Sequence, residues 1–266
     1  MAPVPFFREA GSGPGVVCVH SNASSSGQWR ALMDLLAPRF HILAADTYGA
    51  GKSPSWPQDR KLALPDEVAL LEPVFARAGD RFSLVGHSYG GGIALVGALV
   101  HRQRLRAMVL YEPTLFAVVE QESPSPNDVD GIRNAVTASV AALEAGDAAG
   151  AARCFIDFWM GAGSFDRMPE RVQGATAESV RNIQGWKDAL FDEPTPLQAF
   201  AALDVPVLLM VGSKSPLSSR AVARRLARVL PRVELVELDG LGHMGPITHP
   251  EKVNALIGRF LERHAG

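Results

Sequence analysis

Cysteines, long apolar runs and clusters of like charge are scarce in this sequence of 266 residues. The two cysteines, Cys18 and Cys154, lie in an apolar strand-like segment and in a helical segment, which is typical of reduced packing residues rather than of a disulfide. Nowhere do about 18 apolar residues follow one another, as a membrane-spanning helix would need. The first residues also lack the basic start and apolar core of a signal peptide. We therefore expect a cytoplasmic protein that does not bind membranes.

Acidic and basic residues are nearly balanced, with 28 of the first kind and 26 of the second, and they are interspersed along the chain. This pattern lacks the basic patch that nucleic acid requires. Metal-binding spacings such as H-E-x-x-H and C-x-x-C are missing too, so we expect no metal and no cofactor. With 47% apolar residues, the chain fits one globular α/β domain, a monomer or homodimer that acts on a small molecule.

The most informative stretch is FSLVGHSYGGGIAL, from Phe82 to Leu95. Its first residues predict a buried strand, and the apolar residues after the glycines predict a buried helix. Between them stands G-x-S-x-G, with Gly86 and Gly90 on either side of Ser88. Glycines at these places relieve the crowding of a sharp strand-to-helix turn, which presents the serine as a nucleophile. A dinucleotide-binding fingerprint is excluded, because it requires glycine where Ser88 stands.

A second stretch, DTYGAGKS from Asp46 to Ser53, is similar to the end of a phosphate-binding loop. Its first glycine is replaced by Asp46, and Pro54 and Pro57 follow where such a loop would run into a helix. We therefore reject nucleotide binding and predict a tight turn after a strand.

Strand and helix patterns alternate along most of the chain. Strands are predicted at 16–19, 40–45, 82–85, 105–111, 205–211 and 233–238, and helices at 66–78, 93–100, 218–230 and 250–263. This α/β alternation predicts a mostly parallel sheet flanked by helices on both faces. His20, Ser88, Glu112 and His243 all follow strands, at the edge where ligands bind in such sheets.

The segment from 114 to 203 departs from this alternation. It is alanine-rich and helical in pattern, and proline-rich stretches lie at its entry and exit. Such an insertion between two strands predicts a helical lid over the strand ends. We therefore divide the chain into a core domain, residues 1–113 and 204–266, and an inserted lid, residues 114–203.

A serine hydroxyl becomes a good nucleophile when a base takes its proton, and histidine suits that task near neutral pH. His243 is the candidate, because it stands among glycines in a loop after the last strand and is free to reach Ser88. His87 is better explained as a packed histidine below the turn, and His20 as a residue that organises its loop.

Together these motifs resemble the α/β-hydrolase family from Val16 to Phe260, in the order H-x-x-x…W loop, D-x-x-G-x-G-x-S turn, nucleophile elbow and G-x-G-H loop. The family's chain order of serine, acid and histidine implies a carboxylate before His243. Many family members have an aspartate as the acid, in the turn after the strand that is the seventh in the family's count. In this chain that turn follows the strand predicted at 205–211, and Ser215 stands at the expected aspartate. A serine cannot act as the acid. Members whose acid follows the sixth strand imply Glu112 instead, and Asp239 is the alternative.

The resemblance also implies that the backbone amides of Asn22 and Tyr89 stabilise an oxyanion, although Ser21 stands where most relatives have glycine. The predicted function is that of a serine hydrolase, which cleaves a small, largely apolar carboxylic ester or lactone through an acyl-enzyme and a Ser-His-Glu triad. Aromatic and methionine side chains of the insertion are possible pocket walls, although most should form the lid's own core and only two or three should touch substrate: Phe155, Phe158, Trp159, Met160, Phe165, Met168, Trp186 and Phe191. We select Ser21, Phe158, Trp159, Trp186 and Met244 as pocket residues.

Several alternatives remain open. The same three catalytic residues are compatible with hydrolysis of a carbon–carbon bond in a β-diketone-like substrate, with amide cleavage and with perhydrolysis. The same pocket is compatible with a ligand receptor that hardly turns over. Epoxide opening and halide displacement are disfavoured, because relatives with those activities use an aspartate where this chain has Ser88.

Overall fold

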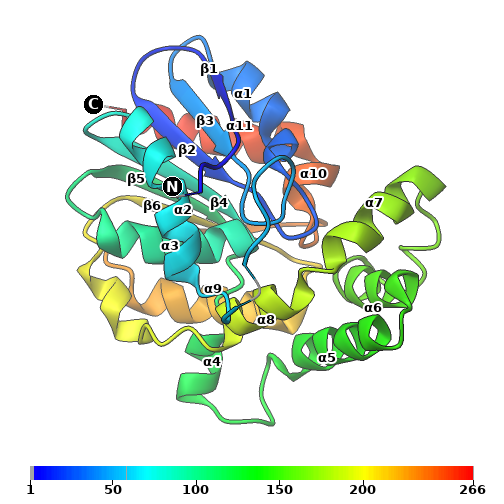
Figure 1. The fold of residues 1–266 in the computed structure, drawn as a ribbon. Helices are drawn as coiled ribbons and strands as arrows, with labels where there is room; N and C mark the ends of the chain where they lie inside the picture. Colours follow the sequence, from blue (N-terminus) through cyan, green and yellow to red (C-terminus); the bar gives the residue numbers. More distant parts are fainter. Residues whose placement is uncertain (1–2, 58, 266) are drawn as a thin grey trace.

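The computed structural model describes residues 3–57 and 59–265, and a seven-stranded sheet with the order β1-β3-β2-β4-β5-β6-β7 lies at its centre (Figure 1). β1 (Phe7–Ala10) pairs antiparallel with β3, and all other neighbouring strands are parallel. The remaining strands are β2 (Gly15–Val19), β3 (His41–Ala45), β4 (Phe82–His87), β5 (Leu105–Tyr111), β6 (Val207–Gly212) and β7 (Val233–Leu238). The mostly parallel sheet predicted from the sequence is confirmed.

Helices cover both faces of this sheet, and each face has its own apolar core. Successive side chains of a strand point to opposite faces, so Val16 of β2 belongs to one core and Val17 to the other. The first core contains α1 (Arg30–Leu36) and α11 (Pro250–Arg263). The second core contains α2 (Leu64–Arg77), α3 (Tyr89–Val100) and α9 (Leu217–Val229). Two short helices, η1 (Ser26–Trp29) and α10 (Gly245–Thr248), lie in the loops after β2 and β7.

Only helices occur between β5 and β6, and the structure describes all residues of this insertion. They are α4 (Ala117–Glu122), α5 (Asp130–Glu144), α6 (Ala148–Met160), α7 (Glu170–Val180), α8 (Ile183–Phe191) and the 3-10 helix η2 (Leu197–Ala202). Figure 1 shows α5, α6 and α7 grouped on one side of the sheet and its covering helices. The expected lack of strands in this part of the chain is confirmed.

Proline explains where two elements differ from the sequence prediction. β6 begins at Val207 rather than at residue 205, because Pro206 has no N–H to donate to the sheet. α2 begins at Leu64 rather than at residue 66, because proline fits the first turn of a helix, where Pro65 stands. The elements predicted at 105–111, 233–238 and 250–263 have the predicted bounds.

The DTYGAGKS stretch forms a tight turn, as expected. Gly49 and Gly51 have positive φ angles of 66° and 55°, and the Asp46 carboxylate accepts hydrogen bonds from the backbone N–H groups of Ser26 and Lys52. Asp46 therefore closes the loop at the place where a phosphate-binding loop would have glycine.

Neither cysteine is in a disulfide: Cys18 is buried in β2, and Cys154 is partly buried in α6. No helix in the described part of the chain combines the length and the apolar character needed to span a membrane.

Candidate active site

Ser88 occupies the sharp turn between β4 and α3, with backbone angles φ 56° and ψ −118°. Both glycines of the motif are required, because neither position has room for a side chain. A Cβ atom on Gly86 would lie 2.5 Å from the carbonyl oxygen of Gly90, and one on Gly90 would lie 2.3 Å from that of Val19. These distances are far below van der Waals contact. Larger residues at either position would block the turn that presents the serine.

Backbone strain is concentrated around this turn. Among the described residues, the non-glycine positions with positive φ are Ser88, Ala23 at 53° and Glu112 at 45°. Ala23 lines a cavity together with Ser88, and Glu112 bonds to the histidine that faces Ser88. Each such residue costs about 1–3 kcal/mol, and strain of this kind clusters at functional sites. The strained backbone positions therefore lie at the same site as the hydrogen-bonded side chains.

A continuous chain of hydrogen bonds joins Ser88, His243 and Glu112, all of which are buried. Ser88 Oγ lies 2.9 Å from His243 Nε2, and His243 Nδ1 lies 2.6 Å from Glu112 Oε2. Because an ionised carboxylate can only accept hydrogen bonds, we assign the proton of the imidazole to Nδ1, which donates it to Glu112. Nε2 is then left to accept the hydroxyl proton of Ser88.

Glu112 is held in place by further donors. Its Oε1 accepts hydrogen bonds from the backbone N–H of Gly212 at 2.7 Å and from the Ser215 hydroxyl at 2.5 Å. Burial opposes ionisation of this carboxyl, but the hydrogen bonds and the nearby imidazole outweigh it and hold the pKa of Glu112 below its ordinary value. Ser215, at the position where the sequence pattern leads one to expect the acid, therefore serves to orient Glu112.

Asp239, the alternative acid, lies apart from this chain of hydrogen bonds. Its carboxylate accepts a hydrogen bond from the Ser213 hydroxyl at 3.2 Å in an exposed position. Within residues 3–57 and 59–265, it has no hydrogen bond to His243.

The loop that carries His243 is tied to the strands beneath it. The Tyr111 hydroxyl donates to the carbonyl oxygen of Gly242 at 2.8 Å, and His87 Nε2 donates to the carbonyl oxygen of His243 at the same distance. The other nitrogen of His87 accepts from the Gln28 side chain at 3.1 Å. Burial, together with the neighbouring His243, lowers the pKa of His87 well below its ordinary value. His87 is thus a neutral packed histidine, as the sequence suggested.

Two backbone amides next to the serine are candidates for an oxyanion hole. Tyr89 is the first residue of α3, where a backbone N–H has no partner within the helix. Asn22 follows Ser21, whose backbone N–H and hydroxyl both donate to Gln28 Oε1, at 3.2 and 3.0 Å. The loop after β2 is therefore fixed by Gln28, which also bonds to His87. No signal in the sequence pointed to Gln28.

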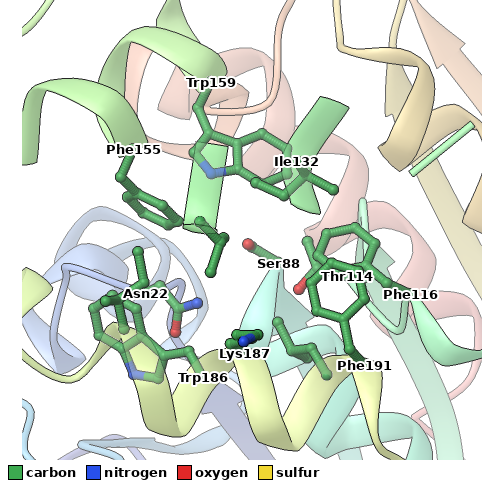
Figure 2. Close-up of a pocket in the computed structure, with 13 residues that line it drawn as sticks. Asn22, Ser88, Thr114, Phe116, Ile132, Phe155, Trp159, Trp186, Lys187 and Phe191 are labelled. Carbon is green, nitrogen blue, oxygen red and sulfur yellow. The ribbon is translucent and has the colours of Figure 1, made fainter. Parts of the chain in front are cut away.

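Two cavities meet at Ser88. The inner cavity has a volume of about 10 Å³, room for one water molecule, and Figure 2 shows the residues that line it. Its lining residues are Asn22, Ser88, Thr114, Phe116, Ile132, Val136, Phe155, Trp159, Ile183, Trp186, Lys187, Leu190 and Phe191. The outer cavity, of about 200 Å³, contains Ser88, His243 and Met244 and is bordered by Met160 and Ile247, which are exposed. It therefore provides the wider approach to the serine.

The predicted pocket residues lie mostly along these cavities. Trp159 lines both, Trp186 lines the inner one, and Ser21 and Met244 line the outer one. Phe158 lines neither of them: it packs edge to face against Trp159 at 4.9 Å and faces Gly131 on α5. The selection of Phe158 was wrong, because residue 158 of α6 faces the neighbouring helix rather than the space above Ser88.

Many of the candidate pocket walls of the insertion face the cavities, and the expectation that two or three of them touch substrate stays a prediction. Six of the eight aromatic and methionine side chains that we considered line one cavity or both, and the exceptions are Phe158 and Phe165. Side chains of the inserted helices therefore line the space above Ser88 and also belong to the apolar core. Sequence reasoning also missed Thr114, Ser219 and Lys187; the Ser219 hydroxyl lies 3.3 Å from His243 Nδ1.

Among the described residues, no group of three or more histidine, cysteine and acidic side chains is arranged to hold a metal.

Comparison with known proteins agrees with this architecture. The family model described as the alpha/beta hydrolase fold matches residues 14–250, and the chain therefore belongs to that family. It is 26% identical to the pimeloyl-[acyl-carrier protein] methyl ester esterase of Nitrosomonas europaea, over 92% of this chain and 95% of that protein. It is 25% identical to the 2-hydroxy-6-oxo-6-(2'-aminophenyl)hexa-2,4-dienoic acid hydrolase of Metapseudomonas resinovorans, over 97% and 88%. A solved alpha/beta hydrolase from Sphaerobacter thermophilus superposes with a TM-score of 0.73 and 25% identity, over 97% and 96% of the two chains.

Proposed function

We propose that the protein is a serine hydrolase that cleaves a small, largely apolar carboxylic ester or lactone through an acyl-enzyme. The observation that carries this proposal is the buried chain of hydrogen bonds from Ser88 through His243 to Glu112. An ester-cleaving relative at 26% identity, matched along nearly its whole length, supports an ester as the substrate class.

The proposed reaction begins when Ser88 Oγ attacks the carbonyl carbon while His243 Nε2 takes the hydroxyl proton. The amides of Asn22 and Tyr89 donate to the oxyanion of the tetrahedral intermediate, and Glu112 stabilises the imidazolium. His243 then gives its proton to the departing alcohol, which leaves the acyl group on Ser88. Water, activated by the same imidazole, releases the acid and restores the hydroxyl.

Residues 114–203 act as a lid in this proposal, over a core of residues 1–113 and 204–266. The inner cavity has almost no free volume, so substrate must displace side chains of the insertion before an acyl group can enter. Its apolar lining favours an apolar acyl chain. A small-molecule substrate and a cytoplasmic location remain predictions from the sequence.

The proposal is tested by mixing the protein with a chromogenic p-nitrophenyl ester of a medium-chain acid and following the release of nitrophenol. We expect a rapid burst followed by turnover, labelling of Ser88 by a fluorophosphonate, and loss of both in Ser88→Ala. Ser55→Ala, which changes an exposed serine, is the matched control. Binding of the fluorophosphonate and ester without turnover would indicate a receptor instead. A β-diketone in the same substrate panel tests the carbon–carbon alternative.

A further inference from the structure

Lys187 is the one charged residue among those that line the inner cavity. Helix α8 contributes five residues to this lining, at positions i, i+3, i+4, i+7 and i+8: Ile183, Trp186, Lys187, Leu190 and Phe191. That spacing defines a single face of a helix. Lys187 therefore stands in the middle of an apolar face that lines the same cavity as Ser88, at a position where the pattern calls for an apolar residue.

The ammonium group of Lys187 pairs with no carboxylate of the described residues. The residue is partly buried, yet in the part of the chain that the structure describes it has neither an ion pair nor a hydrogen bond. Neighbouring cations differ in this respect. Lys61 reaches the Asp192 carboxylate at 2.8 Å, and Arg133 on α5 pairs with Glu120. The carboxylates of Asp192 and Glu120 are thus engaged by other cations, and neither pairs with Lys187.

Two polar atoms close to the serine are also without partners. Thr114 Oγ1 and Asn22 Oδ1 are buried and make no hydrogen bond within the described residues, and both side chains line the inner cavity. In Figure 2 the hydroxyls of Ser88 and Thr114 lie inside the ring of lining residues, with Lys187 and Trp186 on the α8 side. A buried polar atom without a partner costs about 1–3 kcal/mol. Of the two, the Thr114 hydroxyl can donate to an oxygen of a bound ester, whereas Asn22 Oδ1 can only accept.

We propose that Lys187 binds a carboxylate at the far end of the substrate's acyl group, which makes half-esters of dicarboxylic acids the preferred substrates. This inference rests on the proposed function and narrows its substrate class. A single ammonium matches a single negative charge, and the other side chains of this lining are largely apolar, so a methylene chain that displaces side chains of the insertion would lie against apolar surface. A charge-assisted hydrogen bond between an ammonium and a carboxylate is about twice as strong as one between neutral groups.

The test compares two p-nitrophenyl esters that differ only in charge. One is the half-ester of adipic acid, and in the other an isopropyl group of similar shape replaces the free carboxylate. The wild-type protein should cleave the anionic ester with a kcat/KM about tenfold to a hundredfold higher, after subtraction of spontaneous hydrolysis. Lys187→Met, which keeps the length of the side chain but removes the charge, should abolish this preference. Lys187→Arg should retain part of it.

Lys61→Met is the matched control, since it removes a lysine that pairs with α8 from outside the inner cavity; it should keep the wild-type preference. The inference is overturned if the wild-type protein does not prefer the anionic ester, a result that needs no variant to fold. It is also overturned if Lys187→Met keeps the preference, as it would if the ammonium extended into bulk water. Ser88→Ala distinguishes failure of this inference from failure of the proposed function. If that variant loses turnover, the serine mechanism holds even when the wild-type protein shows no preference for the anionic ester.

Discussion

The indole ring of Trp159 lies nearly flat on the imidazole ring of His243, with 3.8 Å between ring centroids and 21° between ring planes. The two residues come from different parts of the chain, Trp159 from α6 of the insertion and His243 from the loop after β7. On another side His243 meets His87, at 5.3 Å and 46°. The insertion therefore contacts the proposed general base directly. An aromatic face against an imidazole stabilises the ring most when it becomes positively charged, as it does during acyl transfer.

Replacement of Trp159 should therefore slow the chemical step. We expect Trp159→Leu to lower kcat by about tenfold, since a cation–π contact of this kind contributes about 1–2 kcal/mol when desolvated. Trp159→Phe keeps an aromatic face and should lose less. The measurement is the rate of Ser88 labelling by a small fluorophosphonate, which reports the activation of the serine with little dependence on the acyl pocket. Equal labelling rates in all three proteins would mean that the stack only shapes the cavity.

The identity of the acid is tested by two amide substitutions. Glu112→Gln should lower kcat by about 10⁴-fold, because the neutral amide can neither hold the imidazole in its reactive tautomer nor stabilise the imidazolium. Asp239→Asn should change kcat by less than about twofold, because Asp239 bonds to Ser213 at the surface. Steady-state rates with a p-nitrophenyl ester, together with circular dichroism of each variant, distinguish loss of function from loss of folding. A large loss in the Asp239 variant alone would reassign the role.

Protein stability should depend on pH through Glu67, a buried residue of α2. Burial raises the pKa of Glu67 to about 7, although hydrogen bonds from the backbone N–H of Tyr48 and the Tyr89 hydroxyl oppose the rise. The folded state then holds this proton more tightly than the unfolded chain, whose value is near 4.5. As the pH rises from about 4.5 to about 7, Glu67 should therefore reduce the free energy of unfolding, by about 3 kcal/mol in total.

Glu67→Gln removes this titration and should flatten the pH dependence over that interval. Urea unfolding at about pH 5 and at about pH 8 measures it. Glu170→Gln, an exposed change on α7, is the control and should follow the wild-type curve. An unchanged slope in the Glu67 variant would show that the carboxyl stays ionised in its buried position.

The fold could be predicted from the sequence because its signals are local. Buried strands such as Leu105–Tyr111 are short apolar runs between turns, and α11 begins at a proline and ends where its apolar spacing ends. The proposed catalytic residues were also within reach, since Ser88, Glu112 and His243 all follow strands whose carboxyl ends meet at one edge. Residues that follow parallel strands are brought together by the sheet itself.

The cavity was harder to predict, because it depends on how helices pack against one another. Periodicity within α6 shows that it has an apolar face, but not whether Phe158 or Phe155 of that face turns to the serine. Lys187 could have been found, since it interrupts the apolar spacing of α8. Gln28 could not, because its partners Ser21 and His87 become neighbours only in the folded chain.

Ser215 offers a last test. Its hydroxyl donates to Glu112, and it stands at the position where the resemblance to the family implied an acidic residue. Ser215→Ala should lower kcat by about tenfold, through loss of a hydrogen bond to a charged group. In a Glu112→Ala background, Ser215→Asp should restore part of the lost activity, since Ser215 Oγ already lies against the Glu112 carboxylate that accepts from His243 Nδ1. We expect a recovery of about tenfold to a hundredfold over Glu112→Ala, measured as kcat with a p-nitrophenyl ester. Ser213→Asp in the same background is the control, because Ser213 bonds to Asp239 at the surface and should restore nothing. Equal recovery in both double variants would mean that any added negative charge suffices, and that the hydrogen bond between Ser215 and Glu112 does not mark an alternative acid position.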